Sequence, residues 1–388
     1  MNDPLIYLIA GEPSGDLLAA RLMVALKEMT GGRVRFAGIG GEAMREQGME
    51  SLFPQADLAV MGLAEVLPRI PKILRRLNQT LADIAERNPA AVVTVDSWGF
   101  TGRVAKRLRA GGSSVPRIHY VAPMVWAWKE KRNLQLAGRV DLLLCLLPEE
   151  PAYFTKVGLR AVHVGHAVLE SGAGHGNGAA FRERHGIAPE TPLLCVLPGS
   201  RRSETSRLLP VFTETVALLA AHRPELQVVV PTVDTVAEEV RRAVWPVPAL
   251  VVRGAGERYD AFAACQAALA ASGTVALELA LARLPMVIGY RLNRLTAMIA
   301  RRLIKIPFVC LINLLAGRMV VPELLLDDCR SDRLAFHLTG LLDDPAVRQA
   351  QLDGAAEALE RLGLGGDTPS RRAASEILSV IKKKGPAS

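Results

Sequence analysis

The most constraining feature of this chain is a regular alternation of short apolar runs with longer amphipathic stretches over its first 165 residues. Residues 4–10 and 35–39 fit buried strands, and 16–29 between them fits a helix. The unbroken apolar run 140–147 is typical of a strand buried on both faces. The alternation continues with expected strands at 91–95 and 117–121 and an expected helix at 102–110. This pattern predicts a parallel sheet covered by helices.

A second alternation of the same kind begins near residue 193. Between the two lies 170–179, in which every second residue from 172 to 178 is glycine, and this composition predicts a flexible linker. Two α/β domains joined by such a hinge would form a cleft. The expected strands of the second domain are 193–197, 227–230, 250–252, 267–271 and 286–289.

The end of the chain, 331–384, is rich in Ala, Leu, Arg and Glu and predicts helices, with breaks at 344–345 and 363–369. We therefore expect three parts: an N-terminal domain over 1–168, a second domain over 169–345, and a helical tail over 346–388 that packs back on the first domain.

Composition narrows the classes of partner. Lys and Arg exceed Asp and Glu by 47 to 39, which favours an anionic ligand or surface. Only 5% of residues are aromatic and no run of basic residues is longer than three, so a nucleic acid is the less favoured partner. The five cysteines form no CxxC pair, as expected of buried thiols in a reducing compartment. With no secretory signal and no apolar stretch of about 18 residues, we expect a cytoplasmic protein that can still lie on a membrane.

Two motifs in the first half follow expected strands. Residues 11–16 (GEPSGD) open a helix and would present backbone N–H groups and the helix dipole to an anion. The alternative is an ordinary turn in which Ser14 or Asp16 caps the helix. Asp96 directly follows a buried strand, where a general base would suit a ligand site, although it could equally cap the next helix.

Two further strand-to-helix turns occur in the second half. In residues 197–204 (LPGSRRSE), Gly199 and Ser200 would offer backbone donors and Arg201 a cation able to neutralise a diphosphate. In residues 271–278 (ASGTVALE), a carboxylate at Glu278 could accept hydrogen bonds from both hydroxyls of a ribose. Simple turns, with Ser272 as a cap and Glu278 on a solvated face, remain the competing interpretation.

Three other segments combine apolar and basic residues. Residues 123–132 hold Trp126 and Trp128 beside cations, so they could pack a sugar or an acyl chain, or simply pack within the fold. The basic amphipathic stretches 66–77 and 291–305 suit either an anionic membrane surface or ordinary surface helices. The seven histidines show no metal-binding spacing, and no metal site is expected.

Taken together, these motifs resemble the lipid-A-disaccharide synthase family of inverting glycosyltransferases with the GT-B fold. The matching segments are 11–16, 59–66, 125–128, 197–201 with Glu204, 272–278, 286–291 and 313–318.

The resemblance implies two Rossmann-like domains facing a cleft and a reaction without a metal or other cofactor. In that reaction UDP-2,3-diacylglucosamine donates its sugar to the 6-hydroxyl of 2,3-diacylglucosamine 1-phosphate, forming a β-1′,6-linked disaccharide and releasing UDP. It also implies peripheral association with the inner face of the cytoplasmic membrane, here through the basic helix 66–77, and leaves a homodimer possible.

The family's motifs also imply roles for individual residues. Asp96 matches the essential base, with Glu12 and Asp16 as second choices. Glu278 would bind the ribose of the donor. The other implied substrate-binding residues are Gly11, Ser14, Gly15, Trp126, Trp128, Gly199, Ser200, Arg201, Glu204, Ser272, Gly273, Thr274, Asn313 and Arg318.

This sequence departs from the family pattern on the acceptor side. Residues 97–101 (SWGFT) replace the usual Ala-Pro-Asp-Phe-Asn, 122–124 (APM) replace Ser-Pro-Ser, and 311–313 (LIN) replace Leu-Pro-Asn. The rival interpretations are another UDP-sugar enzyme of the same fold, with a different acceptor or an epimerase activity, and a nonenzymatic protein that binds anions or nucleic acid.

Overall fold

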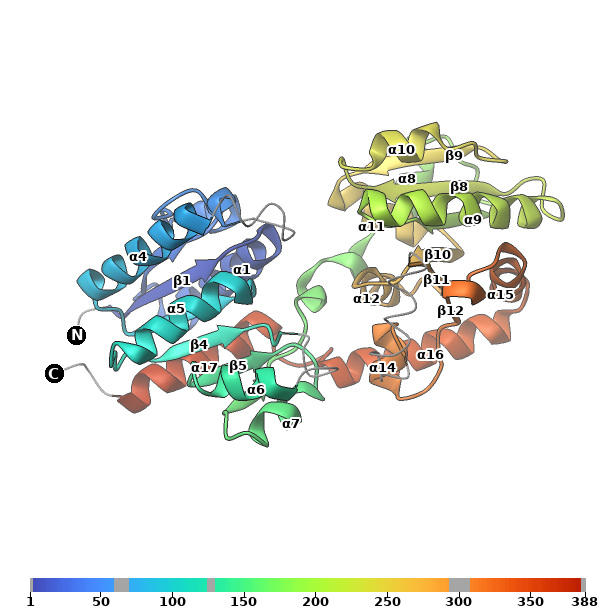
Figure 1. Ribbon diagram of the computed structural model, residues 1–388. Helices are drawn as coiled ribbons and strands as arrows, with labels where there is room; N and C mark the ends of the chain where they lie inside the picture. The colour runs from blue at the N-terminus through green and yellow to red at the C-terminus, as the bar shows by residue number, and fades with distance from the viewer. Residues whose placement is uncertain (1–2, 59–69, 124–129, 293–307, 385–388) are drawn as a thin grey trace. The chain divides into compact units, whose positions relative to one another are not determined.

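The computed structural model describes residues 3–58, 70–123, 130–292 and 308–384. The chain divides into two compact units, one formed by 1–167 with 365–388 and the other by 168–364. Each unit holds a six-stranded sheet in which all strand pairs are parallel (Figure 1). The expectation of two Rossmann-like parallel-sheet domains is therefore confirmed.

The first sheet has the strand order β2-β1-β3-β4-β5-β6. Strand β1 (Leu5–Ala10), the second strand in this order, is buried on both sides. Ile6 and Leu8 face a core that includes α1 (Pro13–Thr30), whereas Tyr7 and Ile9 face a core that includes α4 (Ile70–Arg87) and α5 (Trp98–Ala110). The elements are β1 (Leu5–Ala10), α1 (Pro13–Thr30), β2 (Arg35–Ile39), α2 (Glu42–Glu46), α4 (Ile70–Arg87), β3 (Ala91–Val95), α5 (Trp98–Ala110), β4 (Arg117–Tyr120), α6 (Glu130–Ala137), β5 (Leu142–Cys145), α7 (Glu150–Thr155), β6 (Ala161–His163) and α17 (Pro369–Lys384).

The second sheet has the order β12-β11-β10-β7-β8-β9. Its elements are α8 (Gly178–Arg184), β7 (Leu193–Leu197), α9 (Arg202–Ala220), β8 (Gln227–Thr232), α10 (Ala237–Arg242), β9 (Ala249–Arg253), α11 (Ala255–Ala264), β10 (Ala267–Ala271), α12 (Val275–Leu281), β11 (Met286–Tyr290), α14 (Leu311–Ala316), β12 (Glu323–Leu325), α15 (Ser331–Asp343) and α16 (Pro345–Leu362). The predicted strands agree with these bounds to within a few residues. The short strands β6 and β12 were not predicted, because three residues are too few to show a period.

The expected flexible linker at 170–179 is wrong. This segment forms two short 3-10 turns and the start of α8, and it packs closely on α11. A Cβ at Gly176 would lie 2.0 Å from the Tyr259 carbonyl oxygen, and one at Gly178 would lie 2.4 Å from the Ala263 carbonyl oxygen. The Asn177 N–H also donates to Asp260. The glycines allow two backbones to touch, and the segment belongs to the second unit.

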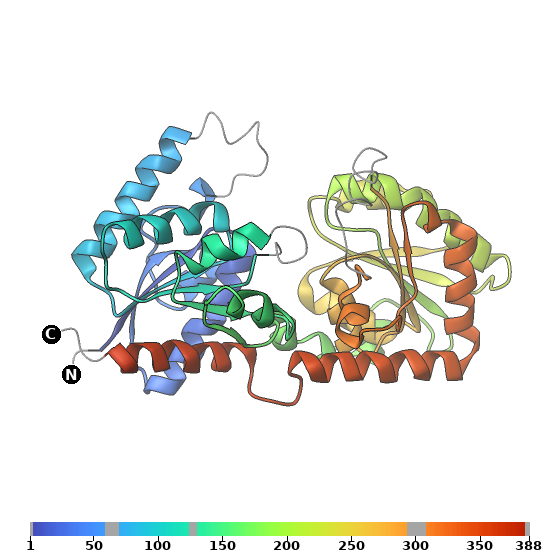
Figure 2. The same cartoon turned by 60° about the horizontal axis from the view of Figure 1, so that its bottom comes forward.

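The expected tail of residues 346–388 is divided between the units. Its helices and breaks lie where the sequence places them, but α16 packs on α12, α14 and α15 within the second unit. Only α17 lies along the first unit (Figure 2), where Ala373, Ala374 and Ile377 are buried with α1 residues. Because Gly363 and Gly365 both have positive φ, the chain can turn between the two helices.

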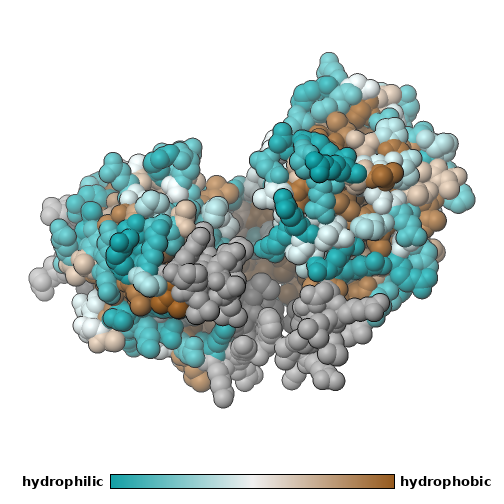
Figure 3. Space-filling view, turned by 45° about the horizontal axis from the view of Figure 1, so that its top comes forward, coloured by the Kyte–Doolittle hydropathy of each residue, from teal (hydrophilic) through white to brown (hydrophobic). Residues whose placement is uncertain are grey.

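No helix among the residues that the structure describes has both the length and the low polarity needed to cross a membrane. On the face drawn in Figure 3, hydrophilic and hydrophobic residues are interspersed over each unit.

The docking of α17 can be tested by trimming its buried side chain. We expect Ile377→Ala to lower the free energy of unfolding by about 2–5 kcal/mol, since it leaves a cavity in the α1 core. Ser375→Ala, on the exposed face of the same helix, should change it by less than about 0.5 kcal/mol. Urea denaturation followed by circular dichroism measures both. Equal effects would mean that α17 does not pack on α1 in solution.

Candidate functional site

The first candidate site lies where the strand order of the first sheet reverses. The chain leaves β1 to reach β2 on one side, and leaves β3 to reach β4 on the other, although β1 and β3 are neighbours. The loops that follow β1 and β3 therefore diverge at the carboxyl edge of the sheet, where open α/β sheets bind ligands. These two loops carry Glu12 and Asp96.

The turn after β3 is held in an unusual conformation. Asp96 and Ser97 have φ of 50° and 45°, in the left-handed region that few residues other than glycine adopt. The turn is fixed from three directions: the Asp96 N–H donates to the Tyr120 carbonyl (2.9 Å), the Thr101 hydroxyl donates to the Asp96 carbonyl (2.8 Å), and the Ser97 N–H donates to Asp96 Oδ1 (2.8 Å). Strain retained by surrounding bonds is common at functional sites, and here it sets the direction of the Asp96 carboxylate.

A cavity of about 400 Å³ opens beside this carboxylate. We call it the Asp96 pocket. Both Glu12 and Asp96 line it, and the Ser97 hydroxyl between them donates to Glu12 (3.3 Å). The pocket is completed by Leu58, Ile73, Trp98, Gly99, Phe100 and Arg103. Two carboxylates, an indole face and a cation thus share one cavity.

The other residues predicted in the β1–α1 loop support this arrangement without lining the pocket. A Cβ at Gly11 would lie 2.8 Å from Ser97 Oγ, so the missing side chain lets the two loops meet. Gly15 is buried close to the Val95 carbonyl, and Ser14 is exposed on the first turn of α1.

Asp16 serves the fold. Its carboxylate is buried and accepts the N–H groups of Gly41 (2.7 Å), Ala43 (2.9 Å) and Met44 (3.3 Å) at the start of α2. A carboxylate bound this way has no access to the Asp96 pocket, so the structure does not favour it as a catalytic base.

The second candidate site lies at the corresponding point of the second sheet. There β7 and β10 are neighbours, β7 leads on to β8, and β10 leads to β11 on the opposite side. A cavity of about 370 Å³, the β7/β10 pocket, lies at this edge. It brings together the residues predicted from two separate motifs: Gly199, Ser200, Arg201, Glu204, Ser272, Gly273, Thr274 and Glu278.

Glu278 points into this pocket beside a cation that the sequence did not reveal. Arg258, on α11, approaches Glu278 at 3.2 Å, and both side chains are largely buried. Burial raises the pKa of Glu278 above its usual value, against the opposing effects of the Arg258 charge and a hydrogen bond from Tyr259. The pocket thus contains a carboxylate whose cost of ionisation is only partly offset within the protein.

Two buried polar atoms of the β7/β10 pocket have no partner. Arg258 Nε and Thr232 Oγ1 are shielded from solvent and make no hydrogen bond with any described residue. Leaving such groups unpaired costs about 1–3 kcal/mol each, and a polar ligand would satisfy them. Neither residue lies in a recognisable motif, so only the folded chain could identify them.

The turn after β7 differs from its expected role. Glu204 Oε2 accepts the N–H groups of Ser200 (3.0 Å) and Arg201 (3.4 Å), so these backbone donors are already taken. The expectation that Ser200 offers a free backbone N–H is therefore wrong. The Arg201 side chain is largely exposed, and its guanidinium lies 3.7 Å from Glu204. The N–H groups of Gly273 and Thr274 have no acceptor among the described residues. These N–H groups and the Arg201 guanidinium are the groups of the pocket that could bind an anion.

Two predicted residues lie elsewhere. Asn313 is fully buried and holds the neighbouring backbone: its Oδ1 accepts from Val320 and Val321, and its Nδ2 donates to Val321. Arg318 is half exposed and pairs with Glu357 at 2.5 Å. Neither lines the β7/β10 pocket.

Several predictions fall outside the described residues. Trp126 and Trp128, the motif at 59–66 and most of the basic stretch at 291–305 belong to this group. Of the stretch 66–77, residues 70–77 are described, at the start of α4. Lys72 (2.5 Å) and Arg76 (2.6 Å) pair there with Asp57, whereas Ile70 and Leu74 are exposed.

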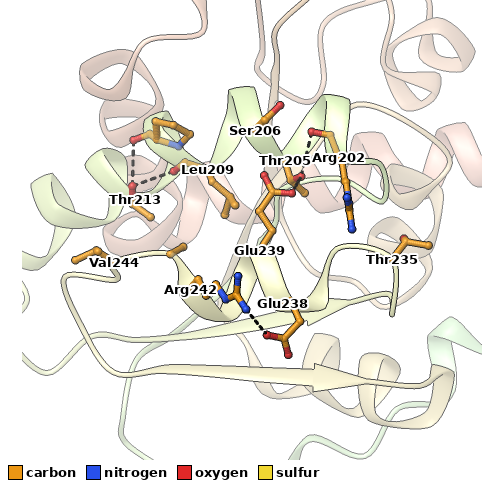
Figure 4. A pocket seen from close by; sticks show the side chains of 12 residues that line it. Arg202, Thr205, Ser206, Leu209, Thr213, Thr235, Glu238, Glu239, Arg242 and Val244 are labelled. Carbon is orange, nitrogen blue, oxygen red and sulfur yellow. Dashed lines mark hydrogen bonds and ion pairs between the residues drawn. The ribbon is translucent and has the colours of Figure 1, made fainter.

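A third hollow, of about 610 Å³, lies between α9 and α10 (Figure 4). Its charged and polar side chains largely satisfy one another: Glu238 pairs with Arg242, and the Thr205 hydroxyl donates to Glu239 (2.7 Å). It contains none of the predicted residues and none of the unpartnered buried atoms, so it is the weaker candidate.

Comparison with known proteins shows the family of the chain. The sequence matches the family described as lipid-A-disaccharide synthetase over residues 6–375. The lipid-A-disaccharide synthase of Paramagnetospirillum magneticum is 61% identical over 98% of both chains, and that of Rhodospirillum centenum is 55% identical over 99% of this chain and 96% of its own.

Solved structures share the fold at low identity. The MnaA–UDP complex of S. aureus matches with a TM-score of 0.64 at 13% identity, over 98% of this chain and 96% of its own. The MurG protein of Acinetobacter baumannii matches with a TM-score of 0.56 at 15% identity, over 98% of this chain and 99% of its own. At such identity the likeness concerns the fold alone.

The two Rossmann-like units, each with a polar pocket where its strand order reverses, define a protein of the GT-B fold class. Within that class, the extent and level of identity settle the family. The chain belongs to the lipid-A-disaccharide synthases.

Proposed function

We propose that the first unit binds the acceptor and supplies the base, while the second unit binds the nucleotide of the donor. The donor is UDP-2,3-diacylglucosamine and the acceptor 2,3-diacylglucosamine 1-phosphate. The observation that carries the proposal is the contrast between the two pockets. Besides Arg103, the first presents the carboxylates of Glu12 and Asp96. Besides Glu204 and Glu278, the second presents the cations of Arg201 and Arg258 and the unpartnered Thr232 hydroxyl.

Asp96 is the better base of the two carboxylates. Its Oδ1 is fixed by the Ser97 N–H, and Oδ2 makes no hydrogen bond with a described residue, so it can accept a proton. The acceptor's 6-hydroxyl oxygen then attacks the anomeric carbon of the donor as its proton passes to Asp96. The bond from that carbon to the diphosphate breaks, its electron pair leaves with UDP, and the configuration at the anomeric carbon inverts.

The leaving diphosphate needs charge stabilisation without a metal. We assign this to the Arg201 guanidinium and to the free N–H groups of Gly273 and Thr274, all of which line the β7/β10 pocket. One such preorganised donor is typically worth about 3–4 kcal/mol at the barrier. Glu278 accepts hydrogen bonds from the ribose hydroxyls, which compensates its burial.

The first prediction concerns the base. Asp96→Asn should lower acceptor-dependent UDP release by about 10²–10⁴-fold, because the proton acceptor is lost while the shape is kept. Glu46→Gln, which removes an exposed carboxylate of the same unit, should leave the rate unchanged. Release is measured in neutral detergent with EDTA, which should have no effect. A near-normal rate in Asp96→Asn would exclude this base, and release without acceptor would contradict transfer.

The second prediction concerns Glu278. The ionised carboxylate is the better acceptor for ribose hydroxyls, and burial raises its pKa. As the pH is lowered, affinity for a UDP-sugar should therefore begin to decline at a higher pH than it would if Glu278 had the usual pKa of a glutamate. Glu278→Gln should bind about 10–100-fold more weakly and remove this pH dependence. Calorimetric titration checks both, with the exposed Glu225→Gln as control, and an unaltered pH profile in Glu278→Gln would refute the assignment.

The proposal includes peripheral binding to an anionic membrane surface through residues 66–77. Ile70 and Leu74 are exposed one helical turn apart on α4, and Arg75 beside them makes no ion pair with a described residue. An apolar pair next to a free cation suits the boundary between lipid headgroups and acyl chains. Ile73 of the same helix lines the Asp96 pocket, which brings this surface close to the acceptor site.

The membrane proposal predicts a local effect. Leu74→Glu should reduce binding to vesicles that contain anionic phospholipid by about tenfold or more. The change replaces an apolar side chain that would enter the membrane with a negative charge that the anionic lipid repels. Ala82→Glu adds the same charge two turns further along α4, at another exposed position, and should reduce it much less. Vesicle sedimentation measures the bound fraction. If the two variants behave alike, this helix is not the contact.

A further inference from the structure

The Asp96 pocket contains a cation that the reaction described above does not use. Arg103 is the one Lys or Arg among the described residues that line it, and its side chain is exposed. No described residue forms a hydrogen bond or an ion pair with its guanidinium. Several other arginines of this unit are paired: Arg109 (3.1 Å) and Arg117 (2.8 Å) with Asp141, and Arg76 with Asp57. The charge of Arg103 is therefore available to a ligand.

Arg103 reaches the pocket from a different element than the carboxylates. The Asp96 carboxylate lies just before the start of α5, whereas Arg103 lies five residues beyond Trp98 on that helix, a rise of about 7.5 Å. Gly99 precedes Arg103 by one helical turn, also lines the pocket, and places no side chain between them. The pocket thus receives its carboxylates from the loops before α1 and α5 and its guanidinium from the second turn of α5.

Part of the pocket's wall is a tryptophan held in place by its neighbours. The Trp98 ring packs on Gly102, where a Cβ would lie only 2.8 Å away, and its centroid is 4.8 Å from that of the His119 ring. The Arg139 guanidinium lies 5.8 Å from the same ring. The His119 ring is fully buried, with its Nδ1 2.8 Å from the Thr94 hydroxyl. An indole fixed in this way is a rigid part of the pocket's lining, against which a sugar ring can pack.

We infer that Arg103 binds the anomeric phosphate of the acceptor sugar and thereby presents the hydroxyl at the far end of that sugar to Asp96. The inference rests on the proposed function, because it concerns the same acceptor. A guanidinium matches the oxygen atoms of a phosphate with two parallel hydrogen bonds. The opposite orientation would bring a phosphate dianion against Glu12 and Asp96, which is repulsive. Arg103 is thus a binding and positioning residue that selects which end of the acceptor meets the base.

The test compares two acceptors, 2,3-diacylglucosamine with and without its 1-phosphate, in neutral detergent. Arg103→Gln should raise the KM for the phosphorylated acceptor by about 10–100-fold, and it should leave kcat/KM for the unphosphorylated acceptor and the KM for the donor unchanged. Arg103→Lys should show a smaller rise in this KM than Arg103→Gln, because lysine keeps the positive charge but cannot make the two parallel hydrogen bonds of a guanidinium. Arg107→Gln is the matched control, since Arg107 is exposed one turn further along the same face and does not line the pocket.

Each outcome bears on a separate claim. If the wild type transfers to the phosphorylated acceptor and Arg103→Gln keeps its KM, or weakens both acceptors equally, the inference is wrong and the proposed function stands. If the wild type forms no disaccharide from either acceptor, the proposed function itself fails. Adding anionic phospholipid to the detergent separates the two sources of phosphate. Suppose that the phospholipid inhibits the wild type but not Arg103→Gln, and that the wild type does not prefer the phosphorylated acceptor. This result would assign the site to a lipid headgroup and overturn the inference.

Discussion

The reversal of strand order in each sheet is the constraint on which the rest of this structure depends. In a parallel sheet every connection returns along a covering helix, so two neighbouring strands whose connections leave on opposite sides open a space at their carboxyl ends. Here the neighbours are β1 and β3 in one unit and β7 and β10 in the other. Both candidate pockets lie at these points. The topology thus fixes where ligands can bind before any side chain is considered, and it explains why four strand-to-helix turns, distant in sequence, supply nearly all the candidate residues.

How far the sequence predicts this structure can be argued from those turns. Apolar period and turn composition located β1, β3, β7 and β10 and the residues that follow them, because buried parallel strands have a strong signal. The same reasoning did not distinguish carboxylates that line a pocket from a carboxylate that only holds backbone N–H groups. Asp16 is buried against the N–H groups at the start of α2 and lines neither pocket, whereas Glu12 and Asp96 line a cavity, yet all three follow a strand and lie near the start of a helix. The difference depends on tertiary partners such as the start of α2, which no local pattern reveals.

Glycine shows the same ambiguity on the scale of a segment. The glycine-rich stretch after residue 170 has the composition of a flexible linker, but Gly176 and Gly178 are there because the backbone of α11 leaves no room for a Cβ. Gly11 plays the corresponding part in the first unit, where it allows the β1–α1 loop to touch Ser97. A glycine can make a loop flexible, but it can also let two backbones pack closely and so hold a segment in place. Composition alone does not tell these two uses apart.

Arg258 and Thr232 were missed for a related reason, since burial without a partner is a property of the folded chain alone.

The two pockets also differ in how much they depend on side chains. In the β7/β10 pocket, backbone and side chains both contribute: the N–H groups of Gly273 and Thr274 have no acceptor among the described residues, and Glu278 lies 3.2 Å from Arg258. The Asp96 pocket is lined mainly by side chains, among them the carboxylates of Glu12 and Asp96. Its wall is also formed by Trp98 and Arg103, within and just after the segment that departs from the family pattern. The strained turn at Asp96 and Ser97 is fixed by the Asp96 N–H bond to the Tyr120 carbonyl of β4 and by the Thr101 hydroxyl of α5, and Thr101 itself belongs to the departing segment. Of these two bonds, only the backbone bond to β4 therefore holds the proposed base whatever side chains follow it, so changes in this segment act on the wall of the pocket and on the turn at once.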